Sequence, residues 1–455
     1  MDYTRKIAEF AVQTRYEEIP PKALEAAKNA MIDCVGVALA GSRELPSRLC
    51  ARLAQEEKAK GKATLFGHGF KSSPITAAFV NGTSAHALDY DHSFTLMGQP
   101  TAGLIPAIFA VGEALGRSGR EVLASYVVGF EVTTKLAWSA PSLSSQGGWH
   151  STGILGSLGA AAGSAKLLRL DAQGVQMALG IATSMASGVV WNFGTMTKPL
   201  HAGLAARNGV LAAKLAHEGF TGNPLILDGP KGFFESFARN LPYDLTPLSG
   251  LGTAFELAQR GVKFKAYPCG GLTHTAIDAV LELRQEHDLT HEIIRSIKVG
   301  VTPYTHDRII YRIPETGLQG KFSMPYILAR AVIDGKLTVE TFSDEAVRDP
   351  VVLSFAEKVS MEIEPELEER LDGSHPCKVW IQLKDGRTLS REKEFPKGTP
   401  EFPLSPEEIR EKFTQCARRV VDGKTASRAL GLLERLERLK SLKSLCRLLA
   451  FPRDV

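Results

Sequence analysis

The chain has 455 residues, of which 44% are apolar and 23% are charged, and its net charge is +4. This balance is typical of a globular protein and excludes a disordered or fibrous one. The length exceeds what one hydrophobic core usually supports, so we expect two domains. The basic residues between Arg435 and Arg447 alternate with leucine at helical spacing. They therefore indicate the solvent-facing side of an amphipathic helix rather than a nucleic-acid-binding patch.

The cysteines and the N-terminus favour a cytoplasmic protein. Six cysteines are scattered along the chain, without a C-x-x-C pair or a histidine partner at zinc spacing. Such a pattern is typical of a reduced compartment. Residues 1–10 carry four charged side chains and no apolar h-region, so we expect no secretory signal or anchor there. No uncharged apolar run reaches the roughly 18 residues of a membrane span, and we predict neither a membrane nor a nucleic acid as a partner.

The first half of the sequence reads as consecutive helices with alanine-rich apolar faces and Gly or Pro at their ends. The predicted helices are residues 21–39, 73–88, 103–115, 119–137, 152–168 and 199–218. The helix at 152–168 carries glycine at 153, 156, 159 and 163. Their spacing is not G-x-G-x-x-G and no β-branched strand precedes them, so we favour tight helix packing over dinucleotide binding.

The periodicity becomes mixed after about Val262. The predicted elements there are helices at 273–286 and 323–333, a strand at 294–301, and a hairpin whose strands flank Asp385-Gly386 and end at Phe395. From Ser405, an N-cap with Glu408 three residues on, the chain is predicted to be helical almost to its end. We therefore predict a mostly α protein: an all-α domain formed by both chain ends, residues 1–262 and 396–455, with an inserted α+β lid domain, residues 263–395.

Three polar clusters each place a basic side chain at the start of a predicted helix: His150, Lys198 and His274. Helix N-termini attract carboxylates and disfavour an extra positive charge on a nearby imidazole. A surface or capping role is the alternative for any one of the three, but three together favour an anion-binding site with proton-transfer groups. The expected caps are Ser151 or Thr152 for the first helix, Pro199 at the first helical position of the second, and Thr275 with Asp278 as a capping box for the third.

A fourth cluster contains His86, Asp89, Asp91 and His92. Metal ligation is the alternative for this cluster, but the histidines are six apart and no H-E-x-x-H spacing is present, so we predict that no metal binds. The sequence also lacks a G-x-S-x-G elbow and a Walker A loop, which argues against hydrolase and kinase chemistry.

The sequence resembles the MmgE/PrpD family in six segments that follow one another in the right order. These segments are residues 86–91, 148–153, 197–203, 219–222, 265–274 and 321–326. The family includes 2-methylcitrate dehydratase, cis-aconitate decarboxylase and iminodisuccinate epimerase, which need neither metal nor organic cofactor. The resemblance implies a homodimer with a helical domain and an α+β lid, acting without a cofactor on a small polycarboxylic acid.

The resemblance also implies a site in a cleft between the domains, with His274 arriving on the lid. The expected catalytic residues are Asp89, His150, Lys198 and His274. The expected substrate-binding residues are Ser93, Gln99, Lys265, Tyr267, Lys321 and Ser323, and a charge on the lid surface is the alternative for Lys265 and Lys321.

One departure from the family pattern concerns Gln99, which stands where the family often has histidine. Glutamine can hydrogen-bond a carboxylate but cannot exchange a proton at neutral pH. We predict a lyase or isomerase that moves a proton next to a carboxylate, and favour a dehydratase or a decarboxylase. An epimerase of an iminodisuccinate-like acid and a non-catalytic carboxylate-binding homologue are the alternatives that the glutamine keeps open.

Overall fold

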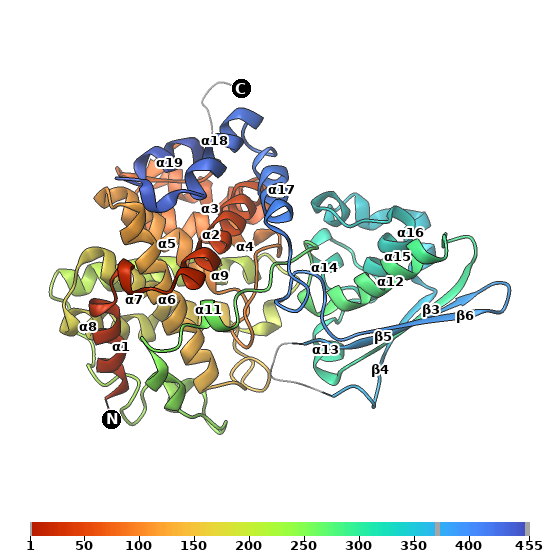
Figure 1. Ribbon diagram of the computed structural model, residues 1–455, viewed down its shortest axis with the longest axis horizontal. Helices are drawn as coiled ribbons and strands as arrows, with labels where there is room; N and C mark the ends of the chain where they lie inside the picture. Colours follow the sequence, from red (N-terminus) through yellow and green to blue (C-terminus); the bar gives the residue numbers. More distant parts are fainter. Residues whose placement is uncertain (1, 369–373, 451–455) are drawn as a thin grey trace. The chain divides into compact units, whose positions relative to one another are not determined.

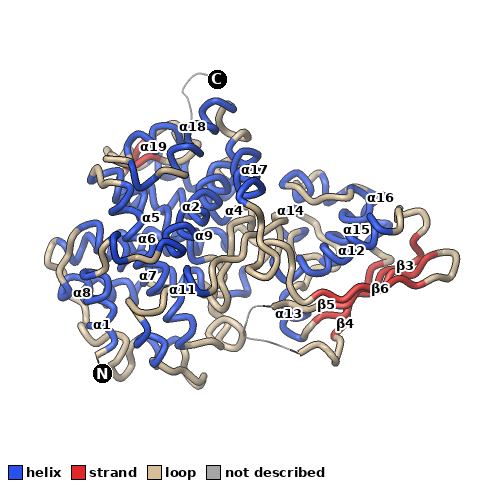
Figure 2. Tube along the Cα trace, in the orientation of Figure 1, coloured by secondary structure: helices blue, strands red, loops and turns tan. Residues whose placement is uncertain are grey.

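The computed structural model describes residues 2–368 and 374–450 and divides into two compact units (Figure 1). The first unit comprises Met1–Asn192, Thr197–Val262 and Ser405–Val455, and the second comprises Phe193–Met196 and Lys263–Leu404. The mostly α fold class predicted from the sequence is confirmed, since strands are few and short (Figure 2). No helix in the described ranges combines the length and the apolar character needed to cross a bilayer.

Helices build the first unit. They are α1 (Tyr3–Gln13), α2 (Pro21–Gly41), α3 (Leu45–Glu56), α4 (Pro74–Ala87), α5 (Pro100–Leu115), α6 (Gly119–Ser139), α7 (Ser151–Leu168), α8 (Ala172–Met185), α9 (Thr197–His217), α10 (Phe233–Phe237), α11 (Glu256–Gln259), α17 (Pro406–Ala417), α18 (Gly423–Leu433) and α19 (Lys443–Leu449). Two-residue strands, β1 (Ala63–Thr64) and β2 (Lys71–Ser72), form a small antiparallel pair. The unit thus joins the N-terminal half of the chain to its C-terminal helices.

Small residues allow the central helices to approach closely. Helix α9 packs against both α4 and α7, and α7 also packs against α6. A Cβ atom built on Gly159 would lie 1.8 Å from Thr133 Oγ1, and one on Gly209 would lie 2.3 Å from the Cβ of Ala160. Neither contact is possible for a real side chain, so the glycines are required by helix packing, which confirms the interpretation of the glycine-rich helix.

The second unit is a four-stranded sheet with helices. Its elements are α12 (His274–Glu286), β3 (Ile294–Val301), α13 (Pro303–Arg308), α14 (Gly317–Gly320), α15 (Met324–Asp334), α16 (Pro350–Ala356), β4 (Val359–Ile363), β5 (Cys377–Leu383) and β6 (Thr388–Lys393). The strand order is β4-β3-β5-β6; β3 and β4 are parallel and the other pairs antiparallel. Every second residue of β5 is buried, as expected for a strand with one face on the core. That core includes residues of α12 and α15, which lie on one face of the sheet (Figure 2).

The helix starts differ from the predicted caps in three places. His150, not Ser151 or Thr152, is the N-cap of α7, and it makes no side-chain cap bond. Helix α9 begins at Thr197, so Pro199 is its third residue rather than its first. Proline is tolerated there because the first four N–H groups of a helix have no intrahelical partner.

The third predicted cap, a capping box at α12, is wrong because its two side chains have other partners. Thr275 lies inside the helix and donates to the carbonyl oxygen of His375, while Asp278 accepts a hydrogen bond from Tyr267. The capping box of Ser405 and Glu408 at α17 is confirmed.

Candidate active site

Asp89 and Lys198 form a buried ion pair in the first unit. Asp89 follows the end of α4 and has a φ of +51°, in the left-handed region that few non-glycine residues adopt. Its Oδ1 lies 2.8 Å from Nζ of Lys198, which comes from the first turn of α9. The two residues are only 3% and 6% exposed. A buried ammonium held beside a carboxylate at a strained backbone position is typical of functional sites.

Two imidazoles are joined beside this pair. Nδ1 of His150 lies 3.0 Å from Nδ1 of His201, and both rings are buried. Burial, together with His86 and Lys198, lowers the pKa of His201 to about 4. Burial and the neighbouring His86, Lys198 and His201 lower the pKa of His150 well below its usual range. Both rings are therefore neutral near pH 7, and each has one unprotonated nitrogen.

His86 connects this histidine pair to a second carboxylate. Its ring stacks on that of His150 at a centroid distance of 5.7 Å. Its Nδ1 lies 3.0 Å from Oδ1 of Asp91, and both side chains are fully buried. Among the described residues, Nε2 of His86 has no hydrogen-bond partner. Asp91 thus orients His86, and His86 extends the polar cluster as far as His150.

A separate buried chain anchors the loop after α4. Oδ2 of Asp33 accepts a hydrogen bond from the backbone N–H of His92 at 3.0 Å and lies 2.9 Å from Nδ1 of the same residue. Its Nε2 lies 2.6 Å from the hydroxyl of Thr101, which lies 2.8 Å from the hydroxyl of Tyr126. Burial opposes the ionisation of Asp33, but the charges of Lys412 and His92 more than offset burial and lower its pKa. This chain fixes the backbone that carries Asp89.

Ser93 and Gln99 lie on the same loop and are partly buried. The backbone N–H of Gln99 donates to Oγ1 of Thr152, and the Thr152 hydroxyl lies 3.4 Å from Gln99 Oε1. Thr152 is in the first turn of α7, two residues after His150. The structure therefore brings Gln99 to the same helix start as His150.

The remaining predicted residues belong to the second unit, where they gather around the segment 265–274. His274 opens α12 and is 2% exposed, and the ring of Tyr267 meets it edge-on at 5.1 Å. Lys265 donates to the carbonyl oxygen of Cys269, and the backbone carbonyl of Lys321 accepts from the N–H of Gly270.

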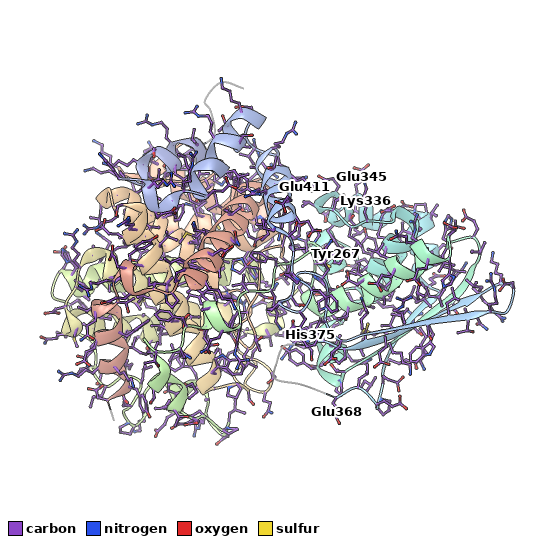
Figure 3. All side chains as sticks on the ribbon, viewed as in Figure 1. Tyr267, Lys336, Glu345, Glu368, His375 and Glu411 are labelled. Atoms are coloured by element: carbon purple, nitrogen blue, oxygen red, sulfur yellow. The ribbon has the colours of Figure 1, made fainter. Side chains whose placement is uncertain are left out.

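Two predicted substrate-binding hydroxyls of this unit have structural partners. Tyr267, which is labelled in Figure 3, donates to Asp278 over 2.6 Å; burial and Asp278 raise the pKa of this phenol. Ser323 caps α15 by accepting from the N–H of Tyr326, and it donates to the carbonyl oxygen of Arg312. Ser323 therefore already has a structural function.

Three residues of the first unit have the composition of a metal site. Ligand atoms of His86, Asp89 and Asp91 lie within 4.8 Å of one another. Yet Asp89 is neutralised by Lys198 and Asp91 is bonded to His86. A divalent ion would have to displace the ammonium group of Lys198, so the donor set fits a metal poorly in this arrangement.

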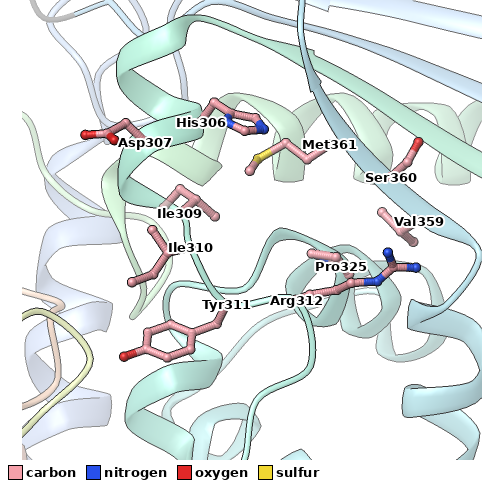
Figure 4. Close-up of a pocket in the computed structure, with 10 residues that line it drawn as sticks. All are labelled: His306, Asp307, Ile309, Ile310, Tyr311, Arg312, Pro325, Val359, Ser360 and Met361. Atoms are coloured by element: carbon pink, nitrogen blue, oxygen red, sulfur yellow. The ribbon is translucent and has the colours of Figure 1, made fainter.

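A pocket of about 440 Å³ opens in the second unit (Figure 4). Its lining comes from the segment 306–312, Pro325 and the start of β4. None of the predicted site residues lines it, so it carries no part of the candidate site.

His201 and His86 are site residues that the sequence reasoning did not select, although both stand in segments that carry the family resemblance. A signal was available for His201: it follows Lys198 by three residues on α9, and residues three apart share one face of a helix. No comparable signal marks the contact of His86 with His150, because these residues are 64 positions apart in the chain.

Comparison with known proteins identifies the family. Residues 5–246 match the MmgE/PrpD N-terminal domain, and residues 267–438 match the MmgE/PrpD C-terminal domain. The chain belongs to the MmgE/PrpD family. Within this family it is 31% identical to the cis-aconitate decarboxylase of Mus musculus, over 93% of this chain and 88% of the relative. It is 28% identical to the enzyme of that name from Homo sapiens, over 95% and 91%, and 28% identical to that of Aspergillus terreus, over 92% and 90%. The expectation of an MmgE/PrpD-type lyase is thus confirmed.

Proposed function

We propose that this MmgE/PrpD protein is a cofactor-independent lyase of small di- and tricarboxylic acids of the aconitate type, and that it favours decarboxylation. The buried group of Asp89, Lys198 and His150 carries the proposal, because it sets an ammonium group, held by a carboxylate, beside a neutral imidazole. The names of the relatives support an aconitate-like substrate.

In the proposed reaction Lys198 binds a carboxylate of the acid. The bond that joins a second carboxylate to the carbon skeleton breaks, and carbon dioxide leaves. The electron pair of that bond is delocalised over the remaining unsaturated acid. One carbon of this delocalised system then takes up one proton. Positive charge fixed in a buried site stabilises the developing enolate-like charge without reorganisation at the moment of reaction.

The proton comes from His150 or His274, which act as the general acid and base. His150 is neutral in the resting protein. A polyanion bound beside it raises its pKa by charge attraction, so the ring takes up a proton as the substrate binds. Proton uptake on binding is measurable by titration calorimetry in buffers of different ionisation enthalpy.

The direct test is incubation of the purified protein with cis-aconitate, citrate, 2-methylcitrate and iminodisuccinate, followed by proton NMR. We expect loss of carbon dioxide from cis-aconitate and appearance of a five-carbon diacid. Water loss from citrate or 2-methylcitrate would point to a dehydratase instead. Tight binding of these acids without turnover would point to a non-catalytic homologue and contradict the proposal.

Gln99 favours one second candidate, an epimerase of an iminodisuccinate-like acid. Epimerisation removes and returns a proton at one carbon and needs fewer titratable groups, so it tolerates glutamine at this position. Replacing Gln99 with histidine should raise decarboxylase activity if this side chain limits proton delivery. An increase in activity towards iminodisuccinate instead would argue for the epimerase.

We further propose that the enzyme works as a homodimer and without a metal, as the family resemblance implies. Light scattering on the purified chain tests the dimer, and a monomer at working concentrations would contradict it.

A further inference from the structure

The imidazole of His201 lies behind that of His150, and the contact between them fixes hydrogen positions on both rings. The two Nδ1 atoms are 3.0 Å apart. Two neutral imidazoles make such a bond only when one Nδ1 carries hydrogen and the other presents its lone pair. The bond therefore allows two arrangements, one with the hydrogen on His150 and one with it on His201.

The backbone around Gly188 holds both rings in place. The N–H of His150 donates to the carbonyl oxygen of Gly188 over 3.0 Å. A Cβ atom built on Gly188 would lie 3.0 Å from Cγ of His201, and this glycine has a φ of +127° that side chains rarely allow. On another side, a Cβ atom on Gly153 would lie 3.4 Å from Cβ of His201. His201 is therefore confined by glycines whose backbone also positions His150.

We propose that His201 is a positioning residue: its Nδ1 accepts the Nδ1–H of His150 and so makes Nε2 the unprotonated nitrogen of His150, the one that exchanges a proton. This inference rests on the proposed function, in which His150 exchanges a proton with the substrate. The arrangement has the logic of the carboxylate behind the imidazole in a catalytic triad, where the partner of one ring nitrogen sets the tautomer and the orientation of the other.

A neutral partner gives His150 a different character from a carboxylate partner. A carboxylate would attract a proton onto the ring and raise its pKa, whereas a neutral imidazole leaves the ring a base at neutral pH. The other charged or titratable groups that face the pair are His86 from α4, Asp89 after α4 and Lys198 from α9. His201 thus fixes the tautomer without adding charge to a pocket that already contains the Asp89–Lys198 pair.

The test follows the ring nitrogens of His150 by ¹⁵N NMR in histidine-labelled full-length protein, without any substrate. The resonances are assigned by their loss in the variant His150→Gln. We expect the Nδ1–H tautomer in the unmodified protein and a mixture of tautomers in His201→Phe, which removes the acceptor. The variant His201→Asp should move the pKa of His150 upward, and His217→Asn, an exposed histidine on the same helix, should change neither.

Kinetics supply the second readout. His201→Phe should lower kcat roughly 10–100-fold, the cost typical of losing a partner that orients a functional histidine, with little change in KM. His201→Asn, whose side-chain amide offers an acceptor, should recover part of that loss. If His201→Phe does not fold, the unmodified protein and His201→Asn still report the tautomer.

An Nε2–H tautomer of His150 in the unmodified protein, or one that is unchanged in His201→Phe, would overturn the inference. Absence of turnover on every acid would overturn the proposed function instead, and it would leave the NMR result to decide the role of His201.

Discussion

The predicted site residues of the two units are held in different ways. In the first unit their side chains bind other polar side chains of the cluster, since Lys198 is paired with Asp89, and His150 is bonded to His201. In the second unit the described bonds of Lys265 and Lys321 run to nearby backbone within the segment 265–274. The first arrangement fixes the charges of the groups, and the second fixes mainly the shape of the loop that carries them.

This difference has an energetic consequence. Groups that share hydrogen bonds or ion pairs respond together to substitution, so their effects are not additive. Groups held by separate backbone contacts respond independently. Substitutions in the first unit should therefore disturb charge, protonation and stability at once, whereas those in the second unit should cost less stability.

The largest effect should come from the two histidines assigned to proton transfer, one in each unit. His150→Gln and His274→Gln should each lower kcat roughly 10²–10⁴-fold, the usual cost of removing a general acid or base. Steady-state kinetics on the two variants and on the control His217→Gln test this. Near-normal turnover in His274→Gln would remove the second unit from the proton-transfer chemistry, and near-normal turnover in both would end this account of the site.

A second experiment compares two buried lysines, Lys198 and Lys265. Lys198→Met leaves the carboxylate of Asp89 buried without its cation, which typically costs roughly 3–5 kcal/mol of the free energy of unfolding. The double variant with Asp89→Asn should recover part of this loss. Lys265→Met removes, among the contacts of this lysine, the bond of its ammonium to the carbonyl oxygen of Cys269, and a hydrogen bond of a charged group is typically worth roughly 1.5–3 kcal/mol. Urea unfolding of the parent and the three variants measures these costs. Equal losses of unfolding free energy for the two lysine substitutions would contradict the comparison.

The third experiment uses the pH dependence of stability. Burial raises the pKa of Glu131, in the first unit, to about 8, although the N–H groups of Glu256 and Leu257 donate to it. The folded protein therefore keeps a proton that the unfolded chain releases near the ordinary pKa of 4.5. The stability that this proton contributes is present below pH 4.5 and is lost as the pH rises to about 8.

Glu131→Gln should remove this pH-dependent loss of stability. The melting temperature of the variant minus that of the parent should therefore rise between pH 4.5 and 8. Asp278, in the second unit, also has a raised pKa, chiefly through burial. Asp278→Asn should show a change of the same sign, beginning near the ordinary aspartate pKa of 3.8. If the parent instead gains stability relative to Glu131→Gln between pH 4.5 and 8, the carboxyl of Glu131 is ionised in the folded protein.

Sequence periodicity was a good guide to the helices and strands. The predicted helix at 119–137 is α6, and the predicted strand at 294–301 is β3 with the same bounds. Long apolar stripes and β-branched runs make such elements readable, because burial of one face enforces the period. Helix α8 and strand β4 were not predicted. The five residues of β4 do alternate apolar and polar side chains, so the signal was present in the sequence, although the run is short and mostly exposed.

Side-chain partners were harder to predict than elements. The loop that contains Asp89 was recognised as polar, but its ion pair with Lys198 joins residues 109 positions apart. Thr275 and Asp278 have capping-box spacing, yet both side chains form hydrogen bonds with partners outside the helix. Local spacing predicts local bonds well only where no tertiary partner competes, as at Ser405 and Glu408. The convergence of His274 with His150 and Lys198, and the roles assigned to them, stay predictions.

The smallest expected effect is that of metal removal, and it sharpens the comparison because only the first unit offers a described ligand set. His86, Asp89 and Asp91 have donor atoms within 4.8 Å of one another, but the ammonium of Lys198 already neutralises Asp89. The ammonium would repel a divalent cation placed there. A buried carboxylate needs a positive partner, and Lys198 already supplies it. Exhaustive chelation should therefore leave the melting temperature and the activity unchanged.

Lys198→Met is the matched variant, since it removes the ammonium group paired with Asp89. Zinc or manganese should raise the melting temperature of this variant and not of the parent. A loss of activity on chelation of the parent, restored by one divalent ion, would show instead that the lysine yields its place to a metal in the working enzyme.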